Sequence, residues 1–291
     1  MRIIRIVLSA IAAIALLLST AAAASAAPRH YRHYVALGDS YTSGPLIPLP
    51  RLDPFGCFRS TSNYPSLVAS SLDVDRFTDV SCGGANTSHM TAPQNVPLGQ
   101  NPPQFSALRP DTDLVTVGIG GNDSGLFGKL VDTCPTLRAS DPTGNPCQRH
   151  FTVDGVDTIK ALLPKTQAAV QQVLAGIHAR SPHATVLAIG YPRIAPAHGY
   201  CPKTLPFANG DYAWLSSVEE GLNAAVSNAV AADGQSSYVD TYTPSFGHDA
   251  CQPHGVAWIN GKDLNLLAAA PYHPFYEGMA GEAKVILQQL R

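Results

Sequence analysis

Charged residues are scarce in this chain, and neither sign is in large excess. Asp, Glu, Lys and Arg make up 14% of the 291 residues, and 45% of the residues are hydrophobic. Typical soluble domains are about one quarter charged, and intrinsic disorder requires low hydrophobicity with high charge. A disordered chain is therefore excluded. The formal net charge of −2 also argues against the basic surface that binds nucleic acid, so we expect no nucleic-acid partner.

Long apolar runs are absent after the first 26 residues. Arg2 and Arg5 precede an apolar run over residues 6–18, and Ala24-Ser25-Ala26 supplies the small residues of a cleavage site. The run is shorter than the roughly 20 residues of a membrane span, although an uncleaved anchor is the alternative. We therefore predict a signal peptide over residues 1–26 and one mature domain over residues 27–291. The mature protein is expected to be a secreted or cell-wall-associated monomer without a stable membrane anchor.

The chain contains no CxxC motif, which argues against a zinc site. Its six cysteines are an even number in a chain with an export signal, which is typical of a disulfide framework. We choose sequential pairing among the many possible schemes, because it closes local loops and leaves the sheet topology free. The predicted bridges are Cys57–Cys82, Cys134–Cys147 and Cys201–Cys251.

Apolar runs with strand character alternate with helical patterns along the chain. Strands are predicted over residues 33–37, 76–80, 113–119, 184–189 and 236–240, and helices over 64–72, 158–179, 212–232 and 275–290. Residues 124–156 show no clear period and contain two cysteines, so we interpret them as a long disulfide-stapled loop. The alternation predicts an α/β fold, with one parallel five-stranded sheet covered by helices on both faces.

Unusual loops follow three of the predicted strands. They contain Gly38-Asp39-Ser40, Gly83-Gly84-Ala85-Asn86 and Gly120-Gly121-Asn122-Asp123. Each motif alone is a common turn or helix cap. Because ligands bind at the carboxyl ends of strands in such sheets, the three loops are expected to meet at one edge. A serine nucleophile needs a base and hydrogen-bond donors for the oxyanion, and this edge offers a hydroxyl, glycine N–H groups and an amide.

Ten histidines compete for the role of base. His273 lies in Pro271-Tyr272-His273-Pro274, directly before the last predicted helix, and the two prolines restrict the backbone around it. A structural role is the default for each histidine taken individually. The position of His273 favours a catalytic role.

These motifs, in this order, resemble the four blocks of the SGNH (GDSL-type) hydrolases. The matching segments are Gly38-Asp39-Ser40-Tyr41-Thr42-Ser43-Gly44, Gly84, Gly120-Gly121-Asn122-Asp123 and His273. The six cysteines and the Gly247–Cys251 segment are similar to the secreted actinobacterial esterase and lipase branch. The resemblance implies a three-layer, flavodoxin-like α/β/α fold and serine-dependent hydrolysis of small-molecule or lipid carboxylic esters, without cofactor or metal. It assigns Ser40 as nucleophile and His273 as base. The oxyanion hole would comprise the Ser40 N–H, the Gly84 N–H and the Asn122 side chain.

The last block departs from the family pattern, which has an aspartate three residues before the histidine. Ala270 occupies that position here. Branch members without this aspartate use a main-chain carbonyl, so we predict that the Ala270 carbonyl orients His273. The alternative is a carboxylate from residues 241–271, with Asp249 and Asp263 as candidates.

Two other functions use the same residues differently. An acyltransferase would share the acyl-enzyme but pass the acyl group to an acceptor other than water, and a glycan- or wall-binding protein would retain only the scaffold. The retention of Ser40, Asn122 and His273 favours hydrolysis. The loops over residues 45–62, 124–156 and 241–271 are expected to form the acyl pocket.

Overall fold

Five parallel strands form the central sheet of the protein. The computed structural model describes residues 30–291, so the predicted signal peptide lies outside the described residues. The strands lie in the order β2-β1-β5-β8-β9, and each neighbouring pair is parallel. Their bounds are β1 His30–Gly38, β2 Asp73–Asp79, β5 Leu114–Gly118, β8 Thr185–Ile189 and β9 Ser237–Val239. The predicted parallel five-stranded sheet is confirmed.

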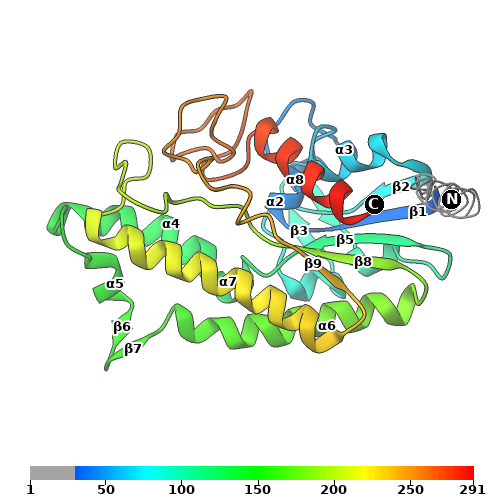
Figure 1. Cartoon of the computed structure of the whole chain (residues 1–291), viewed down its shortest axis with the longest axis horizontal. Coiled ribbons are helices and arrows are strands. Elements are labelled where there is room, and N and C mark those ends of the chain that lie inside the picture. Colours follow the sequence, from blue (N-terminus) through cyan, green and yellow to red (C-terminus); the bar gives the residue numbers. More distant parts are fainter. Residues whose placement is uncertain (1–29) are drawn as a thin grey trace, which may run out of the picture. The chain divides into compact units, whose positions relative to one another are not determined.

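Helices cover both faces of this sheet (Figure 1). On one face lie α3 (Tyr64–Ser71) and α8 (Tyr276–Gln289), and on the other lie α6 (Leu163–Arg180) and α7 (Tyr212–Asp233). Alternate residues of β1 explain the two cores, because successive side chains of a strand point to opposite faces. Tyr34 and Ala36 pack with α3 and α8, whereas Val35 and Leu37 pack with α6 and α7.

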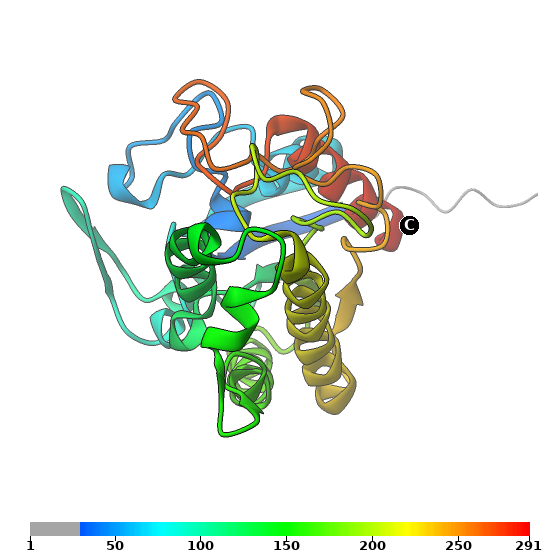
Figure 2. The same cartoon turned by 90° about the vertical axis from the view of Figure 1, so that its left-hand side faces the viewer.

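The carboxyl ends of the strands point to the left in Figure 1, and Figure 2 shows this edge from the front. The loops after β1, β5 and β8 and the long segment before α8 gather here. A short helix, α2 (Ser40–Ser43), follows β1 at this edge, and a small hairpin of β3 (Gln94–Val96) and β4 (Gly99–Asn101) follows β2.

Residues 124–156 are not the aperiodic loop that the sequence predicted. They contain α4 (Leu126–Leu137), α5 (Pro146–His150) and a hairpin of β6 (Thr152–Val153) and β7 (Val156–Asp157). Pro135 lies inside α4, where a proline removes a helical hydrogen bond, and it obscured the helical spacing of the apolar residues. The backbone N–H groups of Cys147 and Gln148, at the start of α5, donate to the Asp211 carboxylate at 3.1 and 2.9 Å.

Three disulfides join the six cysteines in the predicted sequential order. Cys57–Cys82, Cys134–Cys147 and Cys201–Cys251 close loops with sequence separations of 25, 13 and 50 residues. Cys57–Cys82 connects the loop after α2 to the loop after β2, and Cys134–Cys147 connects α4 to α5. The bridges therefore hold segments at the carboxyl edge of the sheet.

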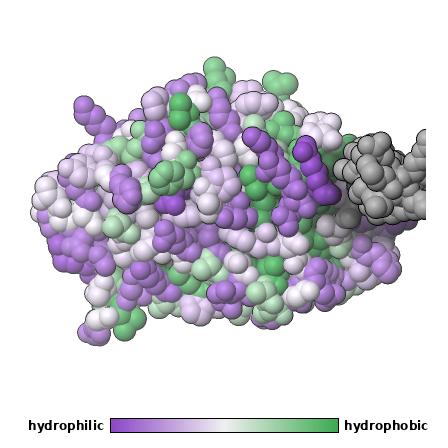
Figure 3. All heavy atoms as spheres, viewed as in Figure 1, coloured by the Kyte–Doolittle hydropathy of each residue, from purple (hydrophilic) through white to green (hydrophobic). Residues whose placement is uncertain are grey.

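The face of the molecule shown in Figure 3 is mainly hydrophilic, with hydrophobic side chains at the upper edge, to the right of the centre and along the lower edge. Exposed leucines occur in the segment before α8, where Leu264, Leu266 and Leu267 are 60%, 67% and 81% exposed. Within residues 30–291, no helix is both long enough and apolar enough to cross a membrane.

Reduction of the three disulfides is expected to lower the free energy of unfolding by about 2–4 kcal/mol per bridge, because each bridge restricts the unfolded chain. Thermal unfolding with and without reductant measures the change. Peptide mapping of the unreduced protein provides the control, and a cross-pair such as Cys82 with Cys134 would contradict the connectivity.

Candidate active site

Ser40 is the first residue of α2, and Asp39, between β1 and Ser40, is the N-cap residue of this helix. The Asp39 side chain accepts a hydrogen bond from the Tyr41 N–H at 2.9 Å. The first N–H groups of a helix have no acceptor within the helix, so the Ser40 N–H remains available as a donor. Ser40 is 8% exposed and lies on the wall of a pocket.

Tyr191 connects the loops that follow β1, β5 and β8. Its hydroxyl donates to Asp39 Oδ2 at 2.6 Å and accepts from the Gly121 N–H at 2.9 Å. Burial raises the pKa of Asp39 to about 7, and the hydrogen bonds from Tyr191 and Tyr41 oppose that shift. Tyr191 was not among the site residues predicted from the sequence, although its position two residues after a strand that ends at this edge is a usable signal.

Asn122 and Asp123 join the loop after β5 to the loop that contains Gly84. Asn122 Nδ2 donates to the Ala85 carbonyl at 2.9 Å, which uses one of its two amide hydrogens. The Asp123 carboxylate accepts from the Thr87 N–H and hydroxyl at 2.9 and 2.8 Å. Asn122 also lines the pocket beside Ser40.

Gly84 is exposed and has a φ of +73°, in the left-handed region that side chains with a Cβ rarely adopt. No residue of the described chain accepts a hydrogen bond from its N–H. The loop therefore presents a backbone donor next to the Asn122–Ala85 hydrogen bond.

His273 lies against two side chains of the pocket wall. Its ring centroid is 5.4 Å from that of Tyr41 and 5.7 Å from that of Phe127. The Tyr41 hydroxyl also donates to the Tyr272 carbonyl at 2.6 Å. Since Tyr41 follows Ser40 directly, these contacts bring the His273 loop to the Ser40 helix.

The carbonyl of Pro271 orients His273, so the prediction of Ala270 is wrong by one residue. His273 Nδ1 lies 2.6 Å from the Pro271 oxygen. The Ala270 carbonyl instead accepts from the backbone N–H of His273 at 3.2 Å and from Asn260 Nδ2 at 3.1 Å. It is thus engaged in closing the turn and does not contact the ring.

A carbonyl oxygen only accepts hydrogen bonds, so Nδ1 of His273 carries the hydrogen and Nε2 is the acceptor. Burial lowers the pKa of His273 to about 4, and the hydrogen bond to Pro271 raises it by a smaller amount. The ring is therefore neutral at neutral pH.

The candidate carboxylates for a triad are bonded elsewhere. Asp249 accepts from the Cys251 N–H at 3.0 Å and from Gln252 at 3.2 Å. Asp263 has a side chain that is 80% exposed and pairs with Lys262. Neither carboxylate contacts His273.

The pocket beside Ser40 is a cavity of about 80 Å³ between α4 and α7. Its apolar wall is contributed by both helices, including Leu126, Leu130, Val131, Leu215, Val218 and Leu222. Of the three segments expected to form the pocket, residues 124–156 contribute through α4, whereas residues 45–62 and 241–271 do not line it. The second wall was not expected from the sequence, because α7 was predicted only as a helix that covers the sheet.

Glu219 is the one acidic side chain that α7 places in this wall. Its carboxyl accepts from the Ile194 N–H at 2.8 Å, and burial raises its pKa to about 8. At pH 7 the carboxyl is therefore mostly neutral, which preserves the apolar character of the pocket. Within the described residues, no group of three or more His, Cys, Asp or Glu side chains could hold a metal ion.

Comparison with known proteins finds a matching family model and several similar lipases. Residues 36–280 match the family model of the GDSL-like lipase/acylhydrolase family. Lipase 2 of Streptomyces coelicolor is 41% identical over 246 residues, covering 83% of this chain and 80% of that protein. A lipase of Streptomyces rimosus is 32% identical over 255 residues, covering 85% and 82%.

Two solved structures share the fold over nearly the whole chain. The phospholipase A1 of Streptomyces albidoflavus NA297 has a TM-score of 0.73 at 27% identity, covering 90% of this chain and 100% of that one. The extracellular lipase of Streptomyces rimosus has a TM-score of 0.72 at 29% identity, covering 88% and 99%.

The fold, the site and these relatives define a carboxylic ester hydrolase. The chain belongs to the GDSL-like lipase/acylhydrolase family, which confirms the resemblance of its motifs to the SGNH hydrolases.

Proposed function

We propose that the protein hydrolyses carboxylic esters through an acyl-enzyme on Ser40, with His273 as the general base. The observation that carries this proposal is the hydrogen bond from His273 Nδ1 to the Pro271 carbonyl, because it leaves Nε2 as a proton acceptor at the Ser40 pocket. In the first step, Ser40 Oγ attacks the ester carbonyl carbon while Nε2 takes the hydroxyl proton. The proton then passes to the leaving alcohol, and a water molecule hydrolyses the acyl-enzyme by the same route.

The oxyanion of each tetrahedral intermediate is proposed to accept hydrogen bonds from the Ser40 N–H, the Gly84 N–H and Asn122 Nδ2. The bond between Asn122 and the Ala85 carbonyl supports this assignment, since it fixes the amide against the loop that holds Gly84. Removing one such donor in other acyl-transfer enzymes costs about 3–4 kcal/mol of transition-state stabilisation.

The apolar cavity between α4 and α7 is proposed to hold the acyl chain of the substrate. It adjoins Ser40 and Asn122, and Glu219, the acidic side chain that α7 contributes to its wall, is mostly neutral at pH 7. The names of the similar Streptomyces proteins, lipase and phospholipase A1, support an acyl ester of a lipid as the substrate class.

We also propose that the protein is secreted after removal of residues 1–26. Three disulfides support an oxidising compartment, and the similar Streptomyces rimosus lipase is described as extracellular. N-terminal sequencing of protein recovered from the culture medium tests the proposal, because an N-terminus other than Ala27 would contradict the cleavage site.

Ser40→Ala is expected to lower the hydrolysis of p-nitrophenyl acetate by at least about a thousand-fold, because the nucleophile is removed. The melting temperature should change little. A serine-directed phosphonate should label Ser40 in the wild type, as peptide mass spectrometry would show. Turnover above about one tenth of the wild-type value in the alanine variant would exclude Ser40 as the nucleophile.

The value of kcat/KM is expected to fall as the pH falls, with a midpoint near the His273 pKa of about 4. Burial disfavours the imidazolium, so the neutral base persists through mildly acidic pH and is lost only below that midpoint. A pH–rate profile of the wild type provides the measurement. A midpoint at or above about 6.5, the usual value for histidine, would contradict the effect of burial.

Variants of His273 and of its two candidate carboxylate partners give the control for this profile. His273→Ala should remove nearly all turnover, whereas Asp249→Asn and Asp263→Asn should each retain turnover within about tenfold of the wild type. A thousand-fold loss in either asparagine variant, with an unchanged circular dichroism spectrum, would show that this aspartate completes a Ser40–His273–Asp triad.

Val218→Phe is expected to reduce kcat/KM for p-nitrophenyl octanoate about tenfold relative to acetate, because the larger ring fills the cavity and each buried methylene contributes about 0.8 kcal/mol. The exposed Ala224 lies on the same helix, so Ala224→Phe is the matched control. A chain-length series of p-nitrophenyl esters measures both variants. An unchanged octanoate-to-acetate ratio in Val218→Phe would place the acyl chain elsewhere.

A further inference from the structure

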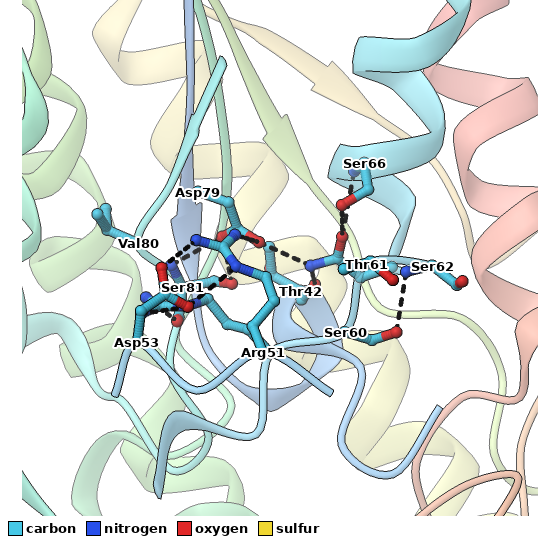
Figure 4. A network of polar contacts seen from close by, with 12 residues as sticks. Thr42, Arg51, Asp53, Ser60, Thr61, Ser62, Ser66, Asp79, Val80 and Ser81 are labelled. Carbon is cyan, nitrogen blue, oxygen red and sulfur yellow. Dashed lines mark hydrogen bonds and ion pairs between the residues drawn. The ribbon is translucent and has the colours of Figure 1, made fainter. Parts of the chain in front are cut away.

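Asp79 lies at the carboxyl end of β2, in a network of polar contacts that the proposed mechanism does not use (Figure 4). Its side chain is fully buried. A buried carboxylate is costly unless charges and hydrogen bonds compensate it. The partners of Asp79 therefore show what the carboxylate holds in place.

The first oxygen of Asp79 holds the loop that leads to Gly84. Oδ1 accepts from the Ser81 N–H at 3.0 Å and from the Ser81 hydroxyl at 2.6 Å. Arg59 Nη1 donates to the Ser81 carbonyl at 3.0 Å from the other side. Ser81 is thus fixed through its side chain and both backbone groups, three residues before the proposed oxyanion-hole glycine.

The second oxygen of Asp79 holds the helix that begins with Ser40. Oδ2 accepts from Asn63 Nδ2 at 2.8 Å, and the same amide nitrogen donates to the Thr42 carbonyl at 3.0 Å. Arg51 Nη1 lies 3.5 Å from Oδ2 and provides a positive charge. Because the last carbonyls of a helix lack donors within the helix, Asn63 both completes α2 and fixes its position.

Asp79 is therefore a bridge between the two segments. Two other connections join the same segments: the Cys57–Cys82 disulfide ties the residue after Ser81 to the loop that follows α2, and the Cys82 N–H donates to the Gly38 carbonyl at 3.0 Å. Asp79 adds the connection that reaches Thr42, through Asn63. A carboxylate suits this position because it accepts hydrogen bonds at both oxygens, whereas an amide offers one accepting oxygen and one donor group.

We propose that Asp79 is a positioning residue that sets the distance between the Ser40 hydroxyl and the Gly84 N–H. The inference rests on the proposed function, since it concerns the alignment of the proposed nucleophile with the proposed oxyanion hole. A misplacement of about 1 Å in such an arrangement can cost about a hundred-fold in rate, so the alignment affects the transition state more than substrate binding.

Asp79→Asn is expected to lower kcat for p-nitrophenyl acetate at least about tenfold, with KM within about threefold of the wild type. The single oxygen of asparagine can replace the acceptor for Ser81 or the acceptor for Asn63, but not both. Its NH₂ group would then lie against the other donor and could not accept that hydrogen bond. The rate at which a serine-directed phosphonate labels Ser40 should fall in the same proportion. A residue that only stabilises the fold would change the melting temperature and leave kcat, measured well below it, unaltered.

Asp113 provides the matched control at the opposite end of the sheet. Its carboxylate accepts from the Arg32 and His33 N–H groups, both at 3.0 Å, and its side chain is 19% exposed. Asp113→Asn should lower the melting temperature while kcat stays within about twofold of the wild type.

Two milder variants test each half of the bridge if Asp79→Asn does not fold. Asn63→Ser retains a side chain able to cap α3 but loses the amide donor to Thr42 and Asp79, and Ser81→Ala removes the shorter bond to Oδ1. Both should lower kcat, by about threefold or more, with little change in KM.

Wild-type kcat in folded Asp79→Asn, or in both half-bridge variants, would overturn the inference. So would an equal loss of kcat in Asp113→Asn, since the effect would then be general. These results would not affect the proposed function. The proposed function would be contradicted by a different result: a wild type that neither hydrolyses the ester nor reacts with the phosphonate at Ser40.

Discussion

The parallel direction of all five strands is the constraint on which the rest of this structure depends. It places every loop that follows a strand at one edge of the sheet. Ser40, Gly84, Asn122 and Tyr191 follow four different strands and are far apart in sequence. The parallel sheet brings them to the same edge. The site is thus a property of the sheet, and each loop contributes a group that has no obvious role in isolation.

Buried hydrogen bonds turn that proximity into a fixed geometry. The Asp39 carboxylate and the Tyr191 hydroxyl connect the loops after β1, β5 and β8. The Asn122 amide joins the loop after β5 to the loop after β2. Such groups are costly to bury unless they are paired, so each pairing also restricts the loops to a single arrangement. Asp39, which follows β1, and Asp79, the last residue of β2, each accept hydrogen bonds from two different segments.

His273, the proposed base, is oriented by a backbone carbonyl and not by a carboxylate. A carboxylate partner would stabilise the imidazolium by charge, whereas the Pro271 carbonyl fixes the tautomer without supplying a charge. The surrounding Tyr41 and Phe127 rings add burial and no compensating anion. The low pKa of His273 follows from this combination, and the ring stays neutral over a wide range of pH.

The sequence by itself indicated the alternation of five strands with helices and the loops that hold Ser40, Gly84, Asn122 and His273, and it made sequential pairing the simplest choice for the six cysteines. These features depend on local patterns: apolar runs that end in glycine-rich turns, a proline-bounded histidine, and cysteines spaced to close local loops. Only the tertiary structure decided that α4 interrupts residues 124–156, that α7 forms the second wall of the pocket, and that Pro271 and not Ala270 faces the imidazole. The last of these depends on backbone torsions in one turn, and the other two on which faces of distant helices meet. Residue spacing does not specify those quantities, because they arise from packing between segments far apart in the chain.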